Sequence, residues 1–88
     1  MTEPADIRLK RLQMRSMRRG IKEMDIILGG FSRRAMADLT PQMLDLYEAL
    51  LEENDQDLYQ WVSGQATAPT AYSDLILHIA KVQEAREI

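Results

Sequence analysis

The chain has 88 residues, no cysteine and a formal net charge of −3 at neutral pH. This length supports one small domain, which we assign to residues 1–88 with a flexible start over about residues 1–5. The lack of cysteine excludes disulfides, thiolate nucleophiles and cysteine zinc sites. The longest strongly apolar run, residues 26–28, is far shorter than the roughly 20 residues of a membrane span. The acidic residues 1–6 resemble neither a signal peptide nor an arginine-rich transit sequence, so we expect a cytoplasmic protein without membrane insertion.

The charges are divided unevenly between the two parts of the chain. Residues 1–34 carry nine Lys and Arg against four Asp and Glu, a net charge of +5. Residues 35–88 carry two basic against ten acidic residues, a net charge of −8. Such a division either steers a charged partner or allows the two parts to pair with each other.

The periodicity predicts an all-α fold, a small five-helix bundle, because apolar residues recur at helical spacing and no strand-like alternation is sustained. A first helix is expected over about residues 6–18, after Pro4. A second is expected over about residues 21–36. Its buried stripe comprises Met24, Ile27, Leu28 and Phe31. Gly29-Gly30 lowers its helix propensity by about 1 kcal/mol for each glycine, which predicts a bend or an early end there.

Local start and stop signals define the three remaining helices. Thr40-Pro41 is typical of a helix start, and this third helix is expected to reach about Glu52. Asn54 is predicted to cap a fourth helix that ends at Gly64, and Thr70 is predicted to open the fifth. The apolar faces of these three helices are Met43, Leu46, Tyr47 and Leu50; Leu58, Trp61 and Val62; and Tyr72, Leu75, Ile76 and Ile79. The helical spacing of Trp61 favours packing against the core over a role as an interface anchor.

The segment between the first two helices, residues 18–25, admits two interpretations. In the first, Gly20 ends one helix in a left-handed conformation or caps the next, which would place Glu23 at the third helical position. In the second, the same junction docks a partner, since glycine lets another chain approach the backbone closely.

The run Arg-Arg-Gly-x-x-Glu-x-Asp, formed by Arg18, Arg19, Gly20, Glu23 and Asp25, resembles the signature of the succinate dehydrogenase FAD assembly factors, the SdhE-like or YgfY-like family. A second block, residues 50–62, is similar to that family's Leu-Leu, acidic turn and Asp-Leu-x-x-Trp pattern. The resemblance extends from about residue 8 to about residue 86. Met24 stands where the family usually has leucine, and Gly29-Gly30 also departs from its pattern.

This resemblance implies a small five-helix fold and a non-enzymatic assembly factor, or chaperone. Its partner would be the flavoprotein subunit of succinate dehydrogenase, or the related subunit of fumarate reductase, to which it would promote covalent attachment of FAD. The FAD would belong to the client, and we expect this chain to bind no cofactor itself and to be a monomer. The motif assigns partner binding to Arg19, Gly20 and Glu23; position and charge add Arg18, Asp25, Arg15 and Arg11.

A basic face on the first helix supports an alternative function. On a helix, its arginines fall within an arc of about 100°. They are Arg8, Arg11, Arg15, Arg18 and Arg19. Such a stripe is either a solvated face, a protein-docking face or a phosphate-binding face. The alternative to an assembly factor is therefore a small regulatory module that binds nucleic acid or a toxin-like partner, although the acidic remainder of the chain argues against specific nucleic-acid binding.

Catalytic and metal-binding groups are sparse. His78 is the only histidine, and Ser73 does not share its helical face well, so we interpret Asp74 and His78 as an exposed helix pair and expect no enzyme. The acidic residues 52–57 lack the glycine and glutamate positions of a calcium loop. Asp55 and Asp57 are predicted instead to stabilise the first turn of the fourth helix.

Overall fold

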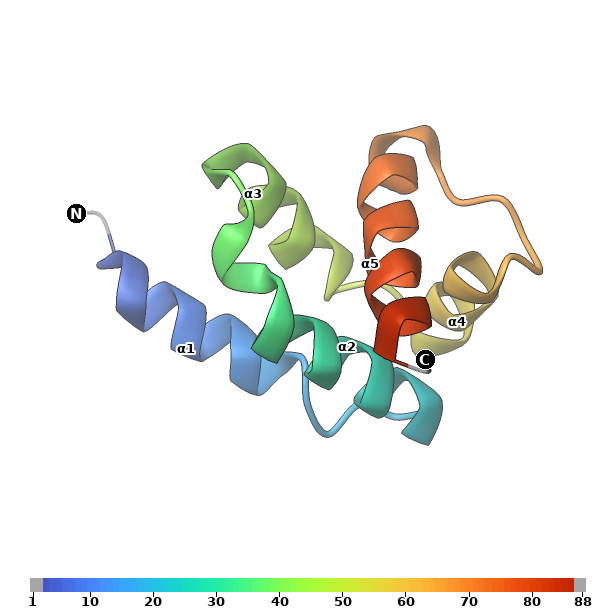
Figure 1. The fold of residues 1–88 in the computed structure, drawn as a ribbon, viewed down its shortest axis with the longest axis horizontal. Coiled ribbons are helices and arrows are strands. Elements are labelled where there is room, and N and C mark those ends of the chain that lie inside the picture. Colours follow the sequence, from blue (N-terminus) through green and yellow to red (C-terminus); the bar gives the residue numbers. More distant parts are fainter. Residues whose placement is uncertain (1–2, 87–88) are drawn as a thin grey trace.

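A computed structural model describes residues 3–86 of the chain and side chains as far as residue 84. Within this range the chain forms α-helices and two short 3-10 turns and no strand (Figure 1). The helices are α1 (Ala5–Arg15), α2 (Lys22–Arg34), α3 (Pro41–Leu50), α4 (Asp55–Ser63) and α5 (Ser73–Arg86); the turns are η1 (Met36–Asp38) and η2 (Thr70–Tyr72). The predicted all-α, five-helix fold is thus confirmed.

The N-terminal segment that we expected to be flexible is described from Glu3 onward. The Glu3 carboxylate accepts hydrogen bonds from Arg11 at 2.9 and 3.0 Å, and α1 begins at Ala5. Residues 1–2 lie outside the described part of the chain.

Helix α2 lies at the centre of the molecule, in contact with α1, α4, α5 and η1. All four residues of its predicted stripe are buried. The early end predicted at Gly29-Gly30 is wrong, because α2 continues to Arg34 with both glycines buried. A Cβ added at Gly29 would lie 3.9 Å from Met17 Cγ and 3.4 Å from Arg33 Nη1. Burial against the rest of the bundle therefore outweighs the low helix propensity of this pair.

Several predicted helix boundaries are confirmed by their caps. Thr40 Oγ1 accepts the Met43 N–H at 3.2 Å, and Asn54 Oδ1 accepts the Gln56 N–H at 2.8 Å. Gly64 ends α4 with a left-handed φ of +83°. The fifth helix differs from its predicted start, because residues 70–72 form the 3-10 turn η2 and the α-helix begins at Ser73.

The end of α1 is fixed by a buried polar contact with α3. Ser16 is fully buried and donates a hydrogen bond to the Leu12 carbonyl at 2.7 Å. The Tyr47 hydroxyl lies 2.6 Å from Ser16 Oγ, and burial raises the pKa of Tyr47 to about 12. The chain turns away at Ser16, so α1 stops at Arg15 and not at the predicted Arg18.

Candidate functional site

The junction between α1 and α2 has a different backbone from the one predicted. Arg18 has the left-handed conformation, with φ of +56°, whereas Gly20 does not. Ile21, in extended conformation, precedes the first residue of α2, so Glu23 is the second and not the third helical residue. Asp25 Oδ1 accepts hydrogen bonds from the backbone N–H groups of Arg18 and Arg19. The interpretation of Gly20 as a helix terminator or cap is therefore wrong, and the Asp25 carboxylate holds the turn instead.

Arg19 points into the molecule. Its Nε and Nη2 atoms both lie 2.7 Å from Asp55 Oδ1, and only 12% of the Arg19 side chain and 16% of the Asp55 side chain are exposed. The guanidinium also donates to the Leu51 carbonyl at 3.0 Å, the Arg15 carbonyl at 3.3 Å and the Glu53 carbonyl at 3.4 Å. Arg19 thus joins the end of α1 to the loop between α3 and α4.

Gly20 is exposed and lies against the same carboxylate. Its N–H donates to Asp55 Oδ2 at 2.6 Å, and a Cβ at position 20 would lie 3.1 Å from that oxygen. Glycine is therefore favoured here by a close approach and not by a left-handed backbone. The sequence predicts a role for Asp55 only in the first turn of α4, and its contact with Arg19 and Gly20 was missed. The only feature of the sequence that could have indicated an Arg19–Asp55 contact is their opposite charge, and nine other acids in residues 35–88 have the same charge as Asp55.

The three arginines of α1 are paired within the molecule. Arg8 lies 2.6 Å from Asp45 and 3.1 Å from Glu48; Arg11 lies 2.9 Å from Glu48. Arg15 lies 2.8 Å from Glu52. We call these contacts the α1–α3 ion pairs. The hydrogen bond from Arg11, followed by that from Arg8, lowers the pKa of Glu48.

The predicted arginine stripe is therefore not a single free surface. Arg18 and Arg19 lie beyond the end of α1, and Arg19 is mostly buried. Arg11 and Arg15 are committed to acids of α3 and of the segment that follows it. Of the two explanations offered for the uneven charge distribution, the structure supports internal pairing for these residues.

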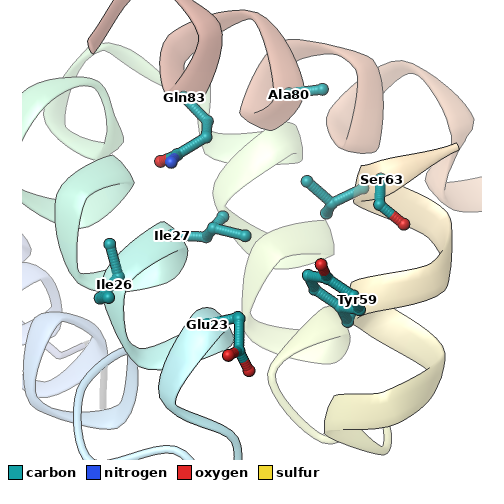
Figure 2. Close-up of a pocket in the computed structure, with 8 residues that line it drawn as sticks. Glu23, Ile26, Ile27, Tyr59, Ser63, Ala80 and Gln83 are labelled. Atoms are coloured by element: carbon teal, nitrogen blue, oxygen red, sulfur yellow. The ribbon is translucent and has the colours of Figure 1, made fainter. Parts of the chain in front are cut away.

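Glu23, the glutamate of the motif, lies at a separate groove between α2, α4 and α5 (Figure 2). The groove has a volume of about 290 Å³. It is lined by Ile26 and Ile27 of α2, Tyr59, Val62 and Ser63 of α4, and Ala80 and Gln83 of α5, together with Glu23. Glu23 and Tyr59 lie at one end, Gln83 lies at the other, and Ile27 lies between them. The motif is thus divided between an internal anchor, Arg19, and a residue that borders an open groove.

The remaining candidate residues have other contacts. Ser73 Oγ donates to the Thr70 carbonyl at 3.1 Å, and the His78 ring lies edge-on to Phe31 at 5.4 Å between centroids. Trp61 is half-buried, 6.0 Å from Tyr72 between centroids, in agreement with its predicted packing role. Among the described residues, no group of three potential ligands could hold a metal ion, and no helix is long and apolar enough to cross a membrane.

Comparison with known proteins identifies the family. Residues 10–83 match the family model described as the flavinator of succinate dehydrogenase. This match covers most of the chain, including the whole junction and the groove. The chain therefore belongs to this family of succinate dehydrogenase assembly factors.

Individual relatives are named succinate dehydrogenase assembly factors and are mitochondrial. The chain is 33% identical over 90 residues to assembly factor 2 of Saccharomyces cerevisiae, with 97% of this chain and 56% of the relative covered. It is 32% identical over 82 residues to assembly factor 2-B of Drosophila mojavensis, with 91% and 52% covered. With assembly factor 2 of Candida glabrata it shares 41% identity over 63 residues, or 72% and 41% of the two chains.

Two consequences follow from these relatives. The chain spans about half the length of the curated relatives that it matches. Their mitochondrial designation contradicts the expectation of a cytoplasmic protein, which rested only on the composition of residues 1–6.

Proposed function

We propose that this chain is a non-enzymatic chaperone that binds the flavoprotein subunit of succinate dehydrogenase and promotes covalent attachment of FAD to that subunit. The observation that carries the proposal is the family match over residues 10–83, a range that contains the complete motif at residues 18–25. The flavoprotein subunit of fumarate reductase is the second client that we propose. In both cases the client holds the FAD, and this chain, acting as a monomer, contributes a binding surface.

The proposed mechanism is selective binding of one client conformation. The assembly factor would bind most tightly to the form of the client in which the flavin and the accepting histidine are correctly placed. Holding two reacting groups in the right geometry accelerates their reaction without any catalytic group from the protein that holds them. This mechanism is consistent with a chain whose Ser73 and His78 are engaged in separate local contacts.

Within the motif, the contacts support a division of roles. Glu23, Gly20 and Arg18 are exposed and are proposed to touch the client. Arg19 and Asp25 are proposed to act indirectly, because their side chains hold the junction in shape. Arg11 and Arg15 contribute to partner binding in this proposal only through the parts of their side chains that remain exposed beside the α1–α3 ion pairs.

The proposal is tested by deleting the gene and measuring covalent flavin on the flavoprotein subunit as fluorescence in a denaturing gel. We expect fluorescence to fall and to be restored by the wild-type chain or by Glu84→Ala, but not by Glu23→Ala. Both substitutions remove one exposed carboxylate, so they are matched in charge. Unchanged fluorescence in the deletion strain would refute the proposed function.

Gly20→Trp is a less direct test of docking than Glu23→Ala. A side chain at position 20 would crowd Asp55 Oδ2 as well as any partner, so its effect combines folding and binding. Its melting temperature must therefore be measured beside its client binding. A folded Gly20→Trp variant that binds the client normally would remove Gly20 from the proposed surface.

A further inference from the structure

The groove between α2, α4 and α5 combines an apolar floor with charged and polar ends. Ile26, Ile27 and Val62 supply aliphatic surface, and 41% of Ile26 is exposed. Glu23 and Tyr59 are at one end of the groove, and Gln83 is at the opposite end (Figure 2). An apolar groove with a few placed polar groups is typical of a site that selects a ligand by shape and orients it by charge.

Glu23 differs from the neighbouring carboxylates because no ion pair or hydrogen bond joins its carboxylate to any of the side chains described, those of residues 3–84. Asp25 accepts backbone N–H groups, Asp55 pairs with Arg19, and Glu53 accepts the Tyr72 hydroxyl at 3.1 Å. The carboxylate of Glu23 is exposed, and none of the residues lining the groove is basic. Among the side chains of residues 3–84, the groove therefore presents a negative charge beside apolar surface, with no lining cation to neutralise it.

We propose that this groove binds a segment of the partner protein in which an aliphatic side chain is followed by arginine. The aliphatic side chain would occupy the floor between Ile27 and Ala80, and the guanidinium would lie between the Glu23 carboxylate and the Tyr59 ring. Arginine fits better than lysine because its planar fork binds a carboxylate through two hydrogen bonds and stacks on an aromatic face. The inference rests on the proposed function for the identity of the partner, whereas the chemistry of the groove can be tested separately.

The groove chemistry is tested with small probes and the full-length chain. Acetyl-Leu-Arg-amide is titrated into ¹⁵N-labelled protein, with acetyl-Leu-Gln-amide and acetyl-Gly-Arg-amide as controls that lack the charge or the aliphatic side chain. We expect saturable shifts of the backbone amides of Ile27, Val62 and Ala80. Both controls should bind at least about fivefold more weakly, because each loses one of the two interactions.

Two substitutions assign the interactions to residues of the groove. Glu23→Gln should abolish the preference for Leu-Arg over Leu-Gln, whereas Glu84→Gln, an equal charge change outside the groove, should preserve it. Ala80→Leu should fill part of the groove and weaken all binding there, whereas Ala49→Leu, on the exposed part of α3, should not. Shifts outside the groove, equal binding of the three probes or no saturable binding would each overturn the inference.

Binding to the purified flavoprotein subunit separates this inference from the proposed function. We expect Glu23→Gln and Ala80→Leu each to weaken that binding by roughly tenfold with little change in melting temperature. If both variants bind the subunit as tightly as the wild-type chain, the groove is not the contact and the inference fails while the proposed function stands. If the wild-type chain does not bind the subunit, the proposed function fails, and the peptide titration still decides what the groove binds.

Discussion

At the scale of single residues, two adjacent arginines have opposite structural roles. The Arg19 side chain is largely buried and makes contacts with Asp55 and three carbonyl groups. The Arg18 side chain is exposed, and its backbone adopts a conformation that L-residues rarely favour. Arg18 and Arg19 are the same residue type, but their different environments predict different effects of substitution on the stability of the fold.

Replacing Arg19 with alanine is predicted to destabilise the fold. The change leaves Asp55 Oδ1 and the Leu51 carbonyl without the Arg19 donor, at a cost of about 2–3 kcal/mol. The melting temperature should then fall by roughly 10–20 °C. Circular dichroism melts would measure this, with Arg18→Ala as the control. A melting temperature of Arg19→Ala within one or two degrees of the wild type would contradict the anchoring role.

Replacing Arg18 with glycine is predicted to stabilise the fold. Glycine adopts a φ of +56° without the steric cost borne by arginine, and the backbone N–H of residue 18 can still bind Asp25. The gain should be about 0.5–1 kcal/mol, which raises the melting temperature by roughly 3–6 °C. Arg18→Ala retains the strained backbone and should have no such effect, so equal melting temperatures for the two variants would argue against strain at residue 18.

At the scale of elements, α1 is joined to α3 by a buried hydrogen bond and by ion pairs. Leu12 is fully buried, and Ser16 contacts Tyr47 at the end of the helix. Along the exposed side, the α1–α3 ion pairs bring three arginines to acids that lie 37 or 40 residues away in sequence. Because these pairs are partly exposed, we expect each to contribute modestly and to be weakened by salt.

The ion pairs predict a defined dependence of stability on pH. The pKa of Glu48 is lowered in the folded state by Arg11 and Arg8, below its ordinary value of 4.5. Its contribution is therefore present above pH 4.5 and is lost as the pH falls through the lower folded pKa. Glu48→Gln should cost about 0.5–1 kcal/mol at pH 7 and should unfold with a smaller difference between pH 7 and pH 3 than the wild-type chain. Identical pH profiles for the two proteins in thermal melts would contradict this, and Glu84→Gln serves as the control.

At the scale of the whole molecule, the basic and acidic parts of the chain fold onto each other. Four of the five arginines that the sequence offered as a phosphate-binding stripe, all except Arg18, pair with acids from the second part of the chain. The net charge of the molecule is −3, so the long-range field does not favour a polyanion. This arrangement removes the main argument for a nucleic-acid-binding module.

We accordingly predict that duplex and single-stranded nucleic acids bind only non-specifically, no tighter than roughly 10⁻⁴–10⁻⁶ M at physiological salt. Mobility-shift titration at two salt concentrations would measure this, with a basic DNA-binding protein as the positive control. Sequence-selective binding in the nanomolar range would restore the alternative function. Such binding would also require the α1–α3 ion pairs to open.

The sequence by itself determined the helices, most of their caps and the family. The stripes of α2 and α5 follow from helical periodicity, and the caps at Thr40 and Asn54 involve residues only two or three positions apart. Such interactions depend on local order along the chain, which a single sequence displays directly.

Only the tertiary structure decided what the motif residues contact. Arg19 and Gly20 meet Asp55 across 36 and 35 residues of sequence, and Glu23 borders a groove whose other walls come from α4 and α5. By charge alone, any of the ten acids in residues 35–88 could have paired with Arg19. The packing of the helices selects among those acids. Electrostatic attraction depends on the distance between two charges in space and not on their separation in sequence, so it acts only between groups that the fold brings together.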